Sequence, residues 1–185
     1  MQKRSLTLME VLVVTIIMAV FVAILGVALV QTRSVFETTD ILVRLQENAR
    51  LAISKLSNDL MRTSISQVTI TQDVPSAGTD RIVYFLPQDA DSNGVPDYTT
   101  NGATWEVGSV SVSLDPSGTG YLLKSEGGNT TVVAQNVKSV RFKDYLIDSG
   151  LYMDELQIVL EMEKTSYDGR VYNSTSTSVI NMRNK

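Results

Sequence analysis

The first candidate functional residue in this sequence is Glu10, whose carboxylate stands next to a long apolar segment. Glu10 directly precedes Val11–Val30, twenty residues without a charge in which only Thr15 is polar. A carboxylate beside or within so apolar a segment is costly to keep charged, and such residues usually have a functional partner. We therefore expect Glu10 to have a functional partner. A carboxylate that only reaches toward the lipid headgroups is the alternative.

A second candidate is the segment Asp89–Asp97, which fits the pattern D-x-D-x-N-G-x-x-D. Oxygen donors at alternate positions can surround a hard cation such as calcium. Thr100 takes the twelfth position, where an EF-hand has a glutamate, and no helices are expected on either side, so this is not an EF-hand. An Asx-rich turn without an ion is the alternative. We predict a structural Ca²⁺ with these ligands: Asp89, Asp91, Asn93, the backbone carbonyl of Val95, and Asp97.

Composition narrows the remaining chemistry. The 185 residues include no His and no Cys, which excludes disulfides, thiol nucleophiles, imidazole bases and zinc sites made of these residues. No carboxylate pair or Ser–Lys spacing indicates catalysis, so we predict no catalytic residue and no enzyme. Sixteen Lys and Arg against 20 Asp and Glu give a net charge of −4, and this balance predicts no nucleic-acid partner.

The apolar segment Val11–Val30 is long enough to cross a membrane, because twenty helical residues span roughly 30 Å. Lys3 and Arg4 precede it, so the N-terminus should be cytoplasmic and the rest of the chain outside. A cleaved secretory signal is the alternative, but its apolar region is usually only about 7–15 residues long. We expect a single-pass membrane protein.

The helix should continue beyond the membrane, from near Leu6 to about Thr63. No Pro occurs before Pro75, and apolar residues recur at spacings of three and four, which is typical of an amphipathic helix. We assign residues 6–30 to the membrane and assembly part, and 31–66 to the amphipathic second half. The apolar stripe consists of Leu42, Leu45, Ala49, Ile53, Leu56 and Leu60. The charged residues Glu47, Arg50, Asp59 and Arg62 should lie on a solvated face.

Residues 67–185 should form an antiparallel β head, which makes the fold class α+β. Alternating apolar residues predict strands, and Asp168-Gly169 predicts a two-residue type I′ hairpin turn before the last of them. Asp115–Gly120 and Glu126–Asn129 should be further turns. The predicted strands form a meander packed on the helix: Ile82–Leu86, Ser109–Leu114, Val137–Phe142, Leu156–Met162 and Val171–Ile180.

The N-terminal residues Lys3-Arg4-Ser5-Leu6-Thr7-Leu8-Met9-Glu10 resemble the start of type IV prepilins and pseudopilins. The resemblance implies a leader of residues 1–5 that prepilin peptidase removes after Ser5, where Gly is usual. Leu6, where Phe is usual, would become the methylated N-terminus. Its new amine would pair with Glu10 of a neighbouring subunit when the helices assemble.

The block Leu45-Gln46-Glu47-Asn48-Ala49-Arg50, followed by Asp59-Leu60 and Arg62, resembles PilW-like minor pilins and the J-type pseudopilins of type II secretion. This resemblance implies a pilin fold and a minor structural subunit of a type IV pilus or secretion filament. Other subunits and an inner-membrane assembly platform would be its partners, first in the inner membrane and then in the filament. The alternatives are a permanently anchored calcium-binding domain, a major pilin and a secreted enzyme.

Overall fold

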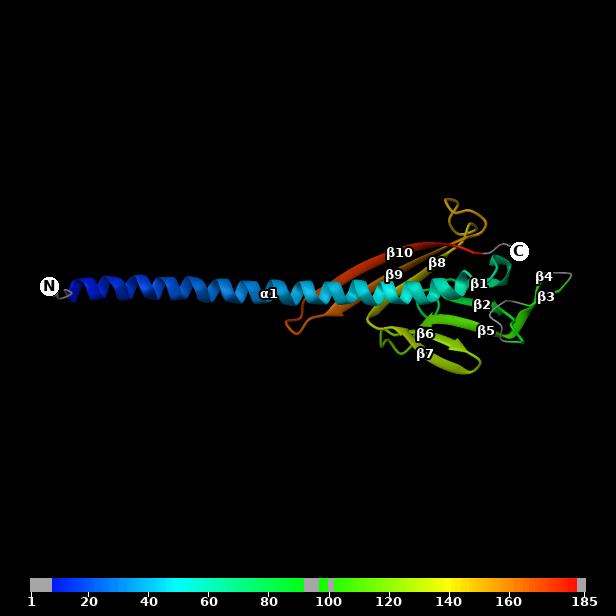
Figure 1. Cartoon of the computed structure of the whole chain (residues 1–185), viewed down its shortest axis with the longest axis horizontal. Helices are drawn as coiled ribbons and strands as arrows, with labels where there is room; N and C mark the ends of the chain where they lie inside the picture. Colours follow the sequence, from blue (N-terminus) through cyan, green and yellow to red (C-terminus); the bar gives the residue numbers. More distant parts are fainter. Residues whose placement is uncertain (1–7, 92–96, 100–101, 183–185) are drawn as a thin grey trace. The chain divides into compact units, whose positions relative to one another are not determined.

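The computed structural model describes residues 8–91, 97–99 and 102–182. One long helix is followed by antiparallel sheets, so the chain is α+β as predicted (Figure 1). The helix α1 (Leu8–Leu60) contains no Pro and runs without a break across Gly26. The chain forms two compact units, unit 1 (residues 1–41) and unit 2 (residues 42–185), and α1 contributes to both.

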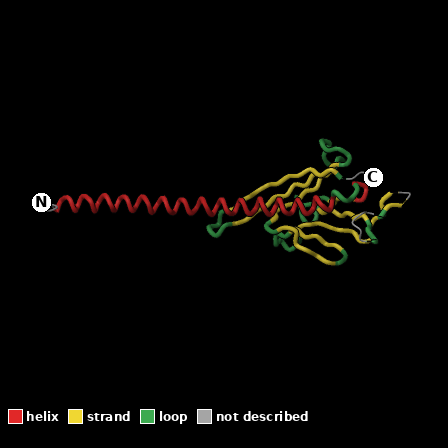
Figure 2. Tube along the Cα trace, in the orientation of Figure 1, coloured by secondary structure: helices red, strands yellow, loops and turns green. Residues whose placement is uncertain are grey.

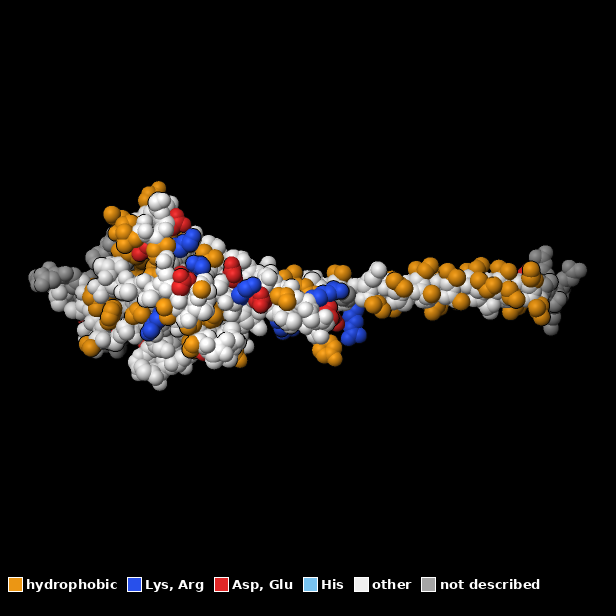
Figure 3. All heavy atoms as spheres, turned by 180° about the vertical axis from the view of Figure 1, so that it is seen from behind, with side chains coloured by type: hydrophobic (Ala, Val, Ile, Leu, Met, Phe, Trp, Pro, Cys, Tyr) orange, Lys and Arg blue, Asp and Glu red, His pale blue; other side chains and the backbone are white. Residues whose placement is uncertain are grey.

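The described part of unit 1 is residues 8–41 of α1. It forms no hydrophobic core of its own. Every residue from Leu8 to Arg33 is exposed, and Figure 3 shows apolar side chains along this segment in orange. The hydroxyl of Thr15 donates to the carbonyl of Leu12 at 2.8 Å, so the one polar side chain of the apolar segment is satisfied within the helix. The helix therefore presents an almost wholly apolar surface to its surroundings.

The helix ends earlier than predicted, at Leu60 and not at Thr63. The amides of Arg62 and Thr63 bond to carbonyls three residues back, at 3.1 and 3.2 Å, which tightens the last turn. The Thr63 hydroxyl then donates to the carbonyl of Phe85 in the first sheet at 2.5 Å. This tertiary bond holds Thr63, just beyond the end of the helix, against the strand that contains Phe85. A 3₁₀-helix, η1 (Ile65–Gln67), follows.

The strands of unit 2 divide into separate sheets, and do not form the single meander that was predicted (Figure 2). The largest sheet has the order β1-β2-β5-β6-β7, a second has the order β10-β9-β8, and β3 pairs with β4; all neighbours are antiparallel. The strands are β1 (Val68–Thr71), β2 (Arg81–Pro87), β3 (Tyr98–Thr99), β4 (Gly102–Ala103), β5 (Trp105–Leu114), β6 (Leu122–Glu126), β7 (Asn129–Ala134), β8 (Val137–Lys143), β9 (Glu155–Thr165) and β10 (Val171–Asn181).

All five predicted strands are confirmed, as β2, β5, β8, β9 and β10, whereas β1, β3, β4, β6 and β7 were not predicted. The predicted Glu126–Asn129 turn is also confirmed, and Gly127 and Gly128 both have positive φ, as a type I′ turn requires. The prediction of a two-residue type I′ turn at Asp168-Gly169 is wrong. Among the residues of that loop only Gly169 has positive φ, and the Ser166 amide bonds to the Arg170 carbonyl, which closes a three-residue loop.

The core of unit 2 lies between the second half of α1 and the inner faces of the two larger sheets. Four residues of the predicted stripe, Leu45, Ala49, Leu56 and Leu60, are buried, whereas Leu42 and Ile53 are half-buried. Alternate residues of β9 are buried as well, as period-two patterning predicts. In the view of Figure 1, β8–β10 lie on one side of these helical turns and β5–β7 on the other.

A buried carboxylate links the two larger sheets. Asp80, directly before β2, is 1% exposed, and its oxygens accept hydrogen bonds from the amides of Asp73 at 3.2 Å and Phe142 at 3.0 Å. Its own amide donates to the carbonyl of Val140 in β8 at 2.7 Å. Asp80 therefore fixes the start of β2 against β8.

Candidate functional site

Glu10 lies in the first turn of α1 and is the only acidic residue there. It is exposed, like the apolar residues on every side of the helix that follows it. An acidic side chain in the first turn also interacts favourably with the positive end of the helix dipole. The predicted processing residues, Ser5 and Leu6, lie outside the described residues.

The helix that carries Glu10 is, by length and composition, long and apolar enough to cross a membrane. None of the residues in its most apolar stretch is buried within the chain. The first ion pair after the apolar segment joins Arg33 Nε to Glu37 Oε1 at 3.3 Å, with both side chains mostly exposed. Charged residues thus begin where the apolar segment ends, which is compatible with a single-pass anchor.

Of the five predicted calcium ligands, Asp89, Asp91 and Asp97 are described, whereas Asn93 and Val95 lie outside the described residues. The base of the loop is closed by backbone bonds. The Asp97 amide donates to the Gln88 carbonyl at 2.8 Å, and Asp97 Oδ2 accepts from the Ala90 amide at 2.9 Å. Asp97 is thereby held next to the segment that contains Asp89.

Within the described part of the chain, no three acidic side chains come together as a group that could hold a metal ion. One oxygen of Asp97 already serves as a hydrogen-bond acceptor inside the loop, although a carboxylate has lone pairs left for a second partner. The calcium ion therefore stays a prediction that rests on the spacing of Asp89–Asp97.

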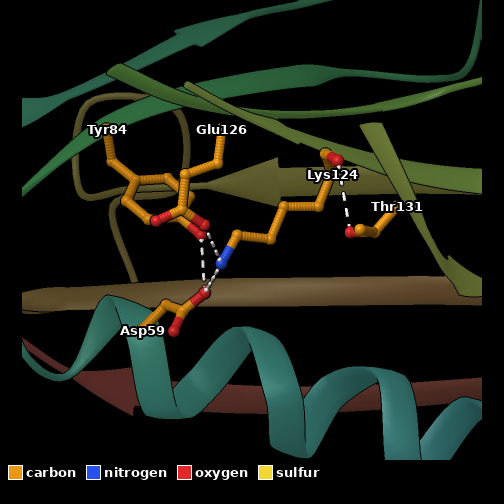
Figure 4. Close-up of polar contacts among 5 residues, drawn as sticks. All are labelled: Asp59, Tyr84, Lys124, Glu126 and Thr131. Atoms are coloured by element: carbon orange, nitrogen blue, oxygen red, sulfur yellow. Dashed lines mark hydrogen bonds and ion pairs between the residues drawn. The ribbon is translucent and has the colours of Figure 1, made fainter. Parts of the chain in front are cut away.

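Unit 2 also contains a polar cluster that the sequence did not predict, which we call the Asp59 cluster: Asp59, Tyr84, Lys124 and Glu126 (Figure 4). Lys124 Nζ lies 2.7 Å from Asp59 Oδ2 and 2.9 Å from Glu126 Oε2. The Tyr84 hydroxyl donates to the same Asp59 oxygen at 3.1 Å. The cluster joins the end of α1 to β2 and β6.

Burial and neighbouring charges shift the pKa values of two residues in the Asp59 cluster, Tyr84 and Lys124. Burial raises the pKa of Tyr84, and the neighbouring carboxylate of Asp59 raises it further. Desolvation opposes the charge of Lys124, but hydrogen bonds to Asp59 and Glu126 outweigh it, so the pKa of Lys124 is also raised. Tyr84 is therefore held neutral and Lys124 is held charged at neutral pH.

A lysine that acts as a nucleophile needs a lowered pKa, so that it can lose its proton. Lys124 is instead held charged between two carboxylates, so it is suited to an electrostatic tie, that is, to holding α1 and β6 together by ion pairs. Asp59, expected on a solvated face, is instead a partner in this tie, with its side chain 23% exposed. No sequence pattern singled out Lys124, because the strand β6 was not predicted. In the structure Lys124 lies on the same face of β6 as the fully buried Leu122, where a charged side chain requires a partner.

The chain matches no family model, no curated protein and no solved structure. The likeness to type IV pilins therefore rests on the residues of the chain itself, above all on the segment that ends at Glu10.

Proposed function

We propose that this chain is a minor pilin or pseudopilin with a pilin-type fold, a structural subunit of a type IV pilus or type II secretion filament. Prepilin peptidase would remove residues 1–5, and the protein would wait in the inner membrane with its N-terminus in the cytoplasm. The assembly platform would then bring it together with other subunits. Its role in this proposal is mechanical and not catalytic.

The observation that carries the proposal is the exposure of α1 in unit 1. From Leu8 to Arg33 no side chain is buried within the chain, and nearly all of them up to Val30 are apolar. At about 25 cal/mol per Å² of apolar surface, so long a segment is strongly driven out of water. Lipid can cover it in one state and the helices of neighbouring subunits in another, and movement between these two environments is what filament assembly requires.

Glu10 is the feature that favours assembly over simple anchoring. An anchor needs no carboxylate at this place, and lipid disfavours one. A helix bundle can use it, because removal of residues 1–5 would create an amine at Leu6 that a neighbour's Glu10 could bind. Each charge would offset the desolvation of the other, and loss of one partner would cost about 3–5 kcal/mol.

The test is incorporation of Glu10→Ala into filaments in the native host. The variant should insert into the membrane normally, since it removes a charge from an apolar helix. It should be depleted from sheared filaments, measured as the ratio of filament-bound to membrane-bound protein on immunoblots. Glu37→Ala, which removes an exposed acidic residue from the same helix, is the matched control and should incorporate like the wild type. Equal incorporation of both variants would contradict the proposed role of Glu10.

A further inference from the structure

The strand β10 is a long sheet edge without the features that usually protect one. It has eleven residues, Val171–Asn181, and pairs with β9 in continuous register, without a bulge. It contains no charged residue and no Pro. Proteins normally blunt exposed edges with charges, Pro or bulges, because unpaired backbone groups recruit other strands. An edge as open as β10 is therefore available to pair with another strand.

The register identifies the backbone groups that are free. At one end the Ser166 amide bonds to the Arg170 carbonyl, and at the other the Met182 amide bonds to the Asp154 carbonyl. Antiparallel ladders alternate, so the even-numbered residues of β10 bond to β9 and the odd-numbered residues point their N–H and C=O groups to the open edge. No hydrogen bond to these outward groups occurs within the described ranges. They belong to Val171, Asn173, Thr175, Thr177, Val179 and Asn181.

A hollow runs along this edge, with a volume of about 420 Å³. Gln46, Arg50 and Ile53 of α1 form one wall, and residues 174–178 of β10 form the other. The inward side chains of β10 are small here: Ser174, Ser176 and Ser178 stand opposite Met162, Leu160 and Ile158 of β9. The apolar inner face of the sheet thus gives way to serines at β10, which leaves room beside the helix.

The charge of the hollow is set by Arg50. It is exposed, and no ion pair to it occurs within the described part of unit 2. An acidic side chain in the hollow would complement it. A second copy of β10 would not, because that strand has no acidic residue and its inward positions beside the hollow are serines that leave the space unfilled.

We propose that β10 binds an extended segment of a partner protein as an added strand. Alternate side chains of that segment fill the hollow between β10 and α1, and an acidic one lies against Arg50. Main-chain bonds to the outward groups supply affinity, and the hollow supplies specificity. This inference rests on unit 2 alone and does not require the chain to form filaments.

The test uses the full chain in detergent micelles and a fluorescein-labelled peptide, Val-Thr-Val-Thr-Glu-Thr-Val-Thr-Val, followed by fluorescence anisotropy. We expect saturable binding that is weakened at least about tenfold in Thr175→Pro, because Pro removes an outward N–H without touching the β9 pairing. Thr175→Ala keeps that N–H and is the matched control, expected to bind like the wild type. The Arg50→Glu variant should prefer a peptide with Lys in place of Glu by about fivefold.

A second measurement guards against misfolding of Thr175→Pro. Two versions of the same peptide, one N-methylated at the Thr residues and the other at the Val and Glu residues, each lack one alternate set of donors. The version without the donors that face β10 should fail to bind the wild-type chain. Binding should also slow hydrogen exchange at the amides of Thr175 and Thr177. Absence of saturable binding, or binding that survives Thr175→Pro and both N-methylations, would overturn the proposal. So would a dimer of the free chain that Thr175→Pro abolishes, because a second copy would then be the occupant.

Discussion

At the scale of single residues, Lys124 should contribute more to stability than the other lysines of the β head. Lys124→Met leaves Asp59 without its charged donor and should lower the free energy of unfolding by about 1–2 kcal/mol, since both side chains are largely buried. Urea unfolding of the full chain in micelles, followed by the fluorescence of Trp105, the single Trp, measures this.

Lys138→Met is the control for this change. Lys138 also forms a close ion pair, to Glu163 at 2.8 Å, but its side chain is 50% exposed. Water screens such a pair, so the unfolding midpoint should hardly move. Equal losses in the two variants would show that burial of the Asp59 cluster has no energetic consequence.

The raised pKa values of Tyr84 and Lys124 predict a loss of stability in alkali. In the unfolded chain these groups would release their protons near their ordinary pKa values of 10.0 and 10.5, whereas the folded chain would still hold them. Both contributions are complete below those values and are lost as the pH rises through the folded-state pKa. For the buried Tyr84, the free energy of unfolding should fall by up to about 1.4 kcal/mol per pH unit above pH 10.

Urea midpoints measured from pH 9 to pH 11 test this dependence. Tyr84→Phe removes one of the two groups, so its midpoint should fall less steeply than that of the wild type. Tyr167→Phe, at a fully exposed tyrosine, should follow the wild type. If Tyr84→Phe shows the wild-type slope, Tyr84 has no raised pKa.

Calcium at the segment Asp89–Asp97 remains a residue-level prediction. If the affinity is that of extracellular calcium modules, a Kd of about 10⁻⁴–10⁻³ M, millimolar calcium should stabilise the full chain by about 1 kcal/mol. Melting curves with calcium and with chelator should then differ, and Asp91→Ala should remove the difference. Asp168→Ala, at an exposed turn, should keep it. Identical curves for the wild type, without calcium heat in calorimetry, would leave only a polar turn.

The sequence predicted exposed and isolated features at the residue scale better than it predicted contacts. The position of Glu10 beside an uninterrupted apolar segment can be seen directly in the sequence. The role of Asp59 cannot, because its partner Lys124 is 65 residues away and helical periodicity does not reveal which strand packs on the helix.

At the scale of elements, Asp80 should stabilise the packing of β2 against β8. Asp80→Ala would leave the amides of Asp73 and Phe142 without an acceptor and should cost about 2–4 kcal/mol. Asp80→Asn keeps one acceptor oxygen and should cost about half as much. Urea unfolding measures both variants, and an alanine variant as stable as the wild type would show that these bonds are dispensable.

The predicted strands were those with a clear apolar alternation, and the reason lies in burial. β9 has an apolar face against the core, so every second residue is apolar. β7 is an edge strand with four exposed residues in succession, and β1 has only four residues, none of them buried. Such strands are held by pairing with a neighbour more than by a core, and pairing leaves little pattern in the sequence.

At the scale of the whole molecule, the two units differ in how much of their apolar surface is exposed to solvent. Unit 2 buries its apolar residues between a helix and two sheets, whereas unit 1 exposes nearly all of those it has. The helix α1 belongs to both units. A domain with its own hydrophobic core is therefore continuous with a segment whose apolar surface is unfavourable in water. The anchored state and the assembled state of the proposed function would both use this combination.

The mature N-terminus, determined by mass spectrometry of the protein isolated from its native host, tests the central claim most directly. We expect a chain that lacks residues 1–5 and begins at Leu6 with one added methyl group, because that cut places the new amine four residues before Glu10, where it could bind Glu10 of a neighbour. A chain that retains Met1, or one cut after Val30, would contradict the account: the first would be a permanent anchor and the second a secreted protein.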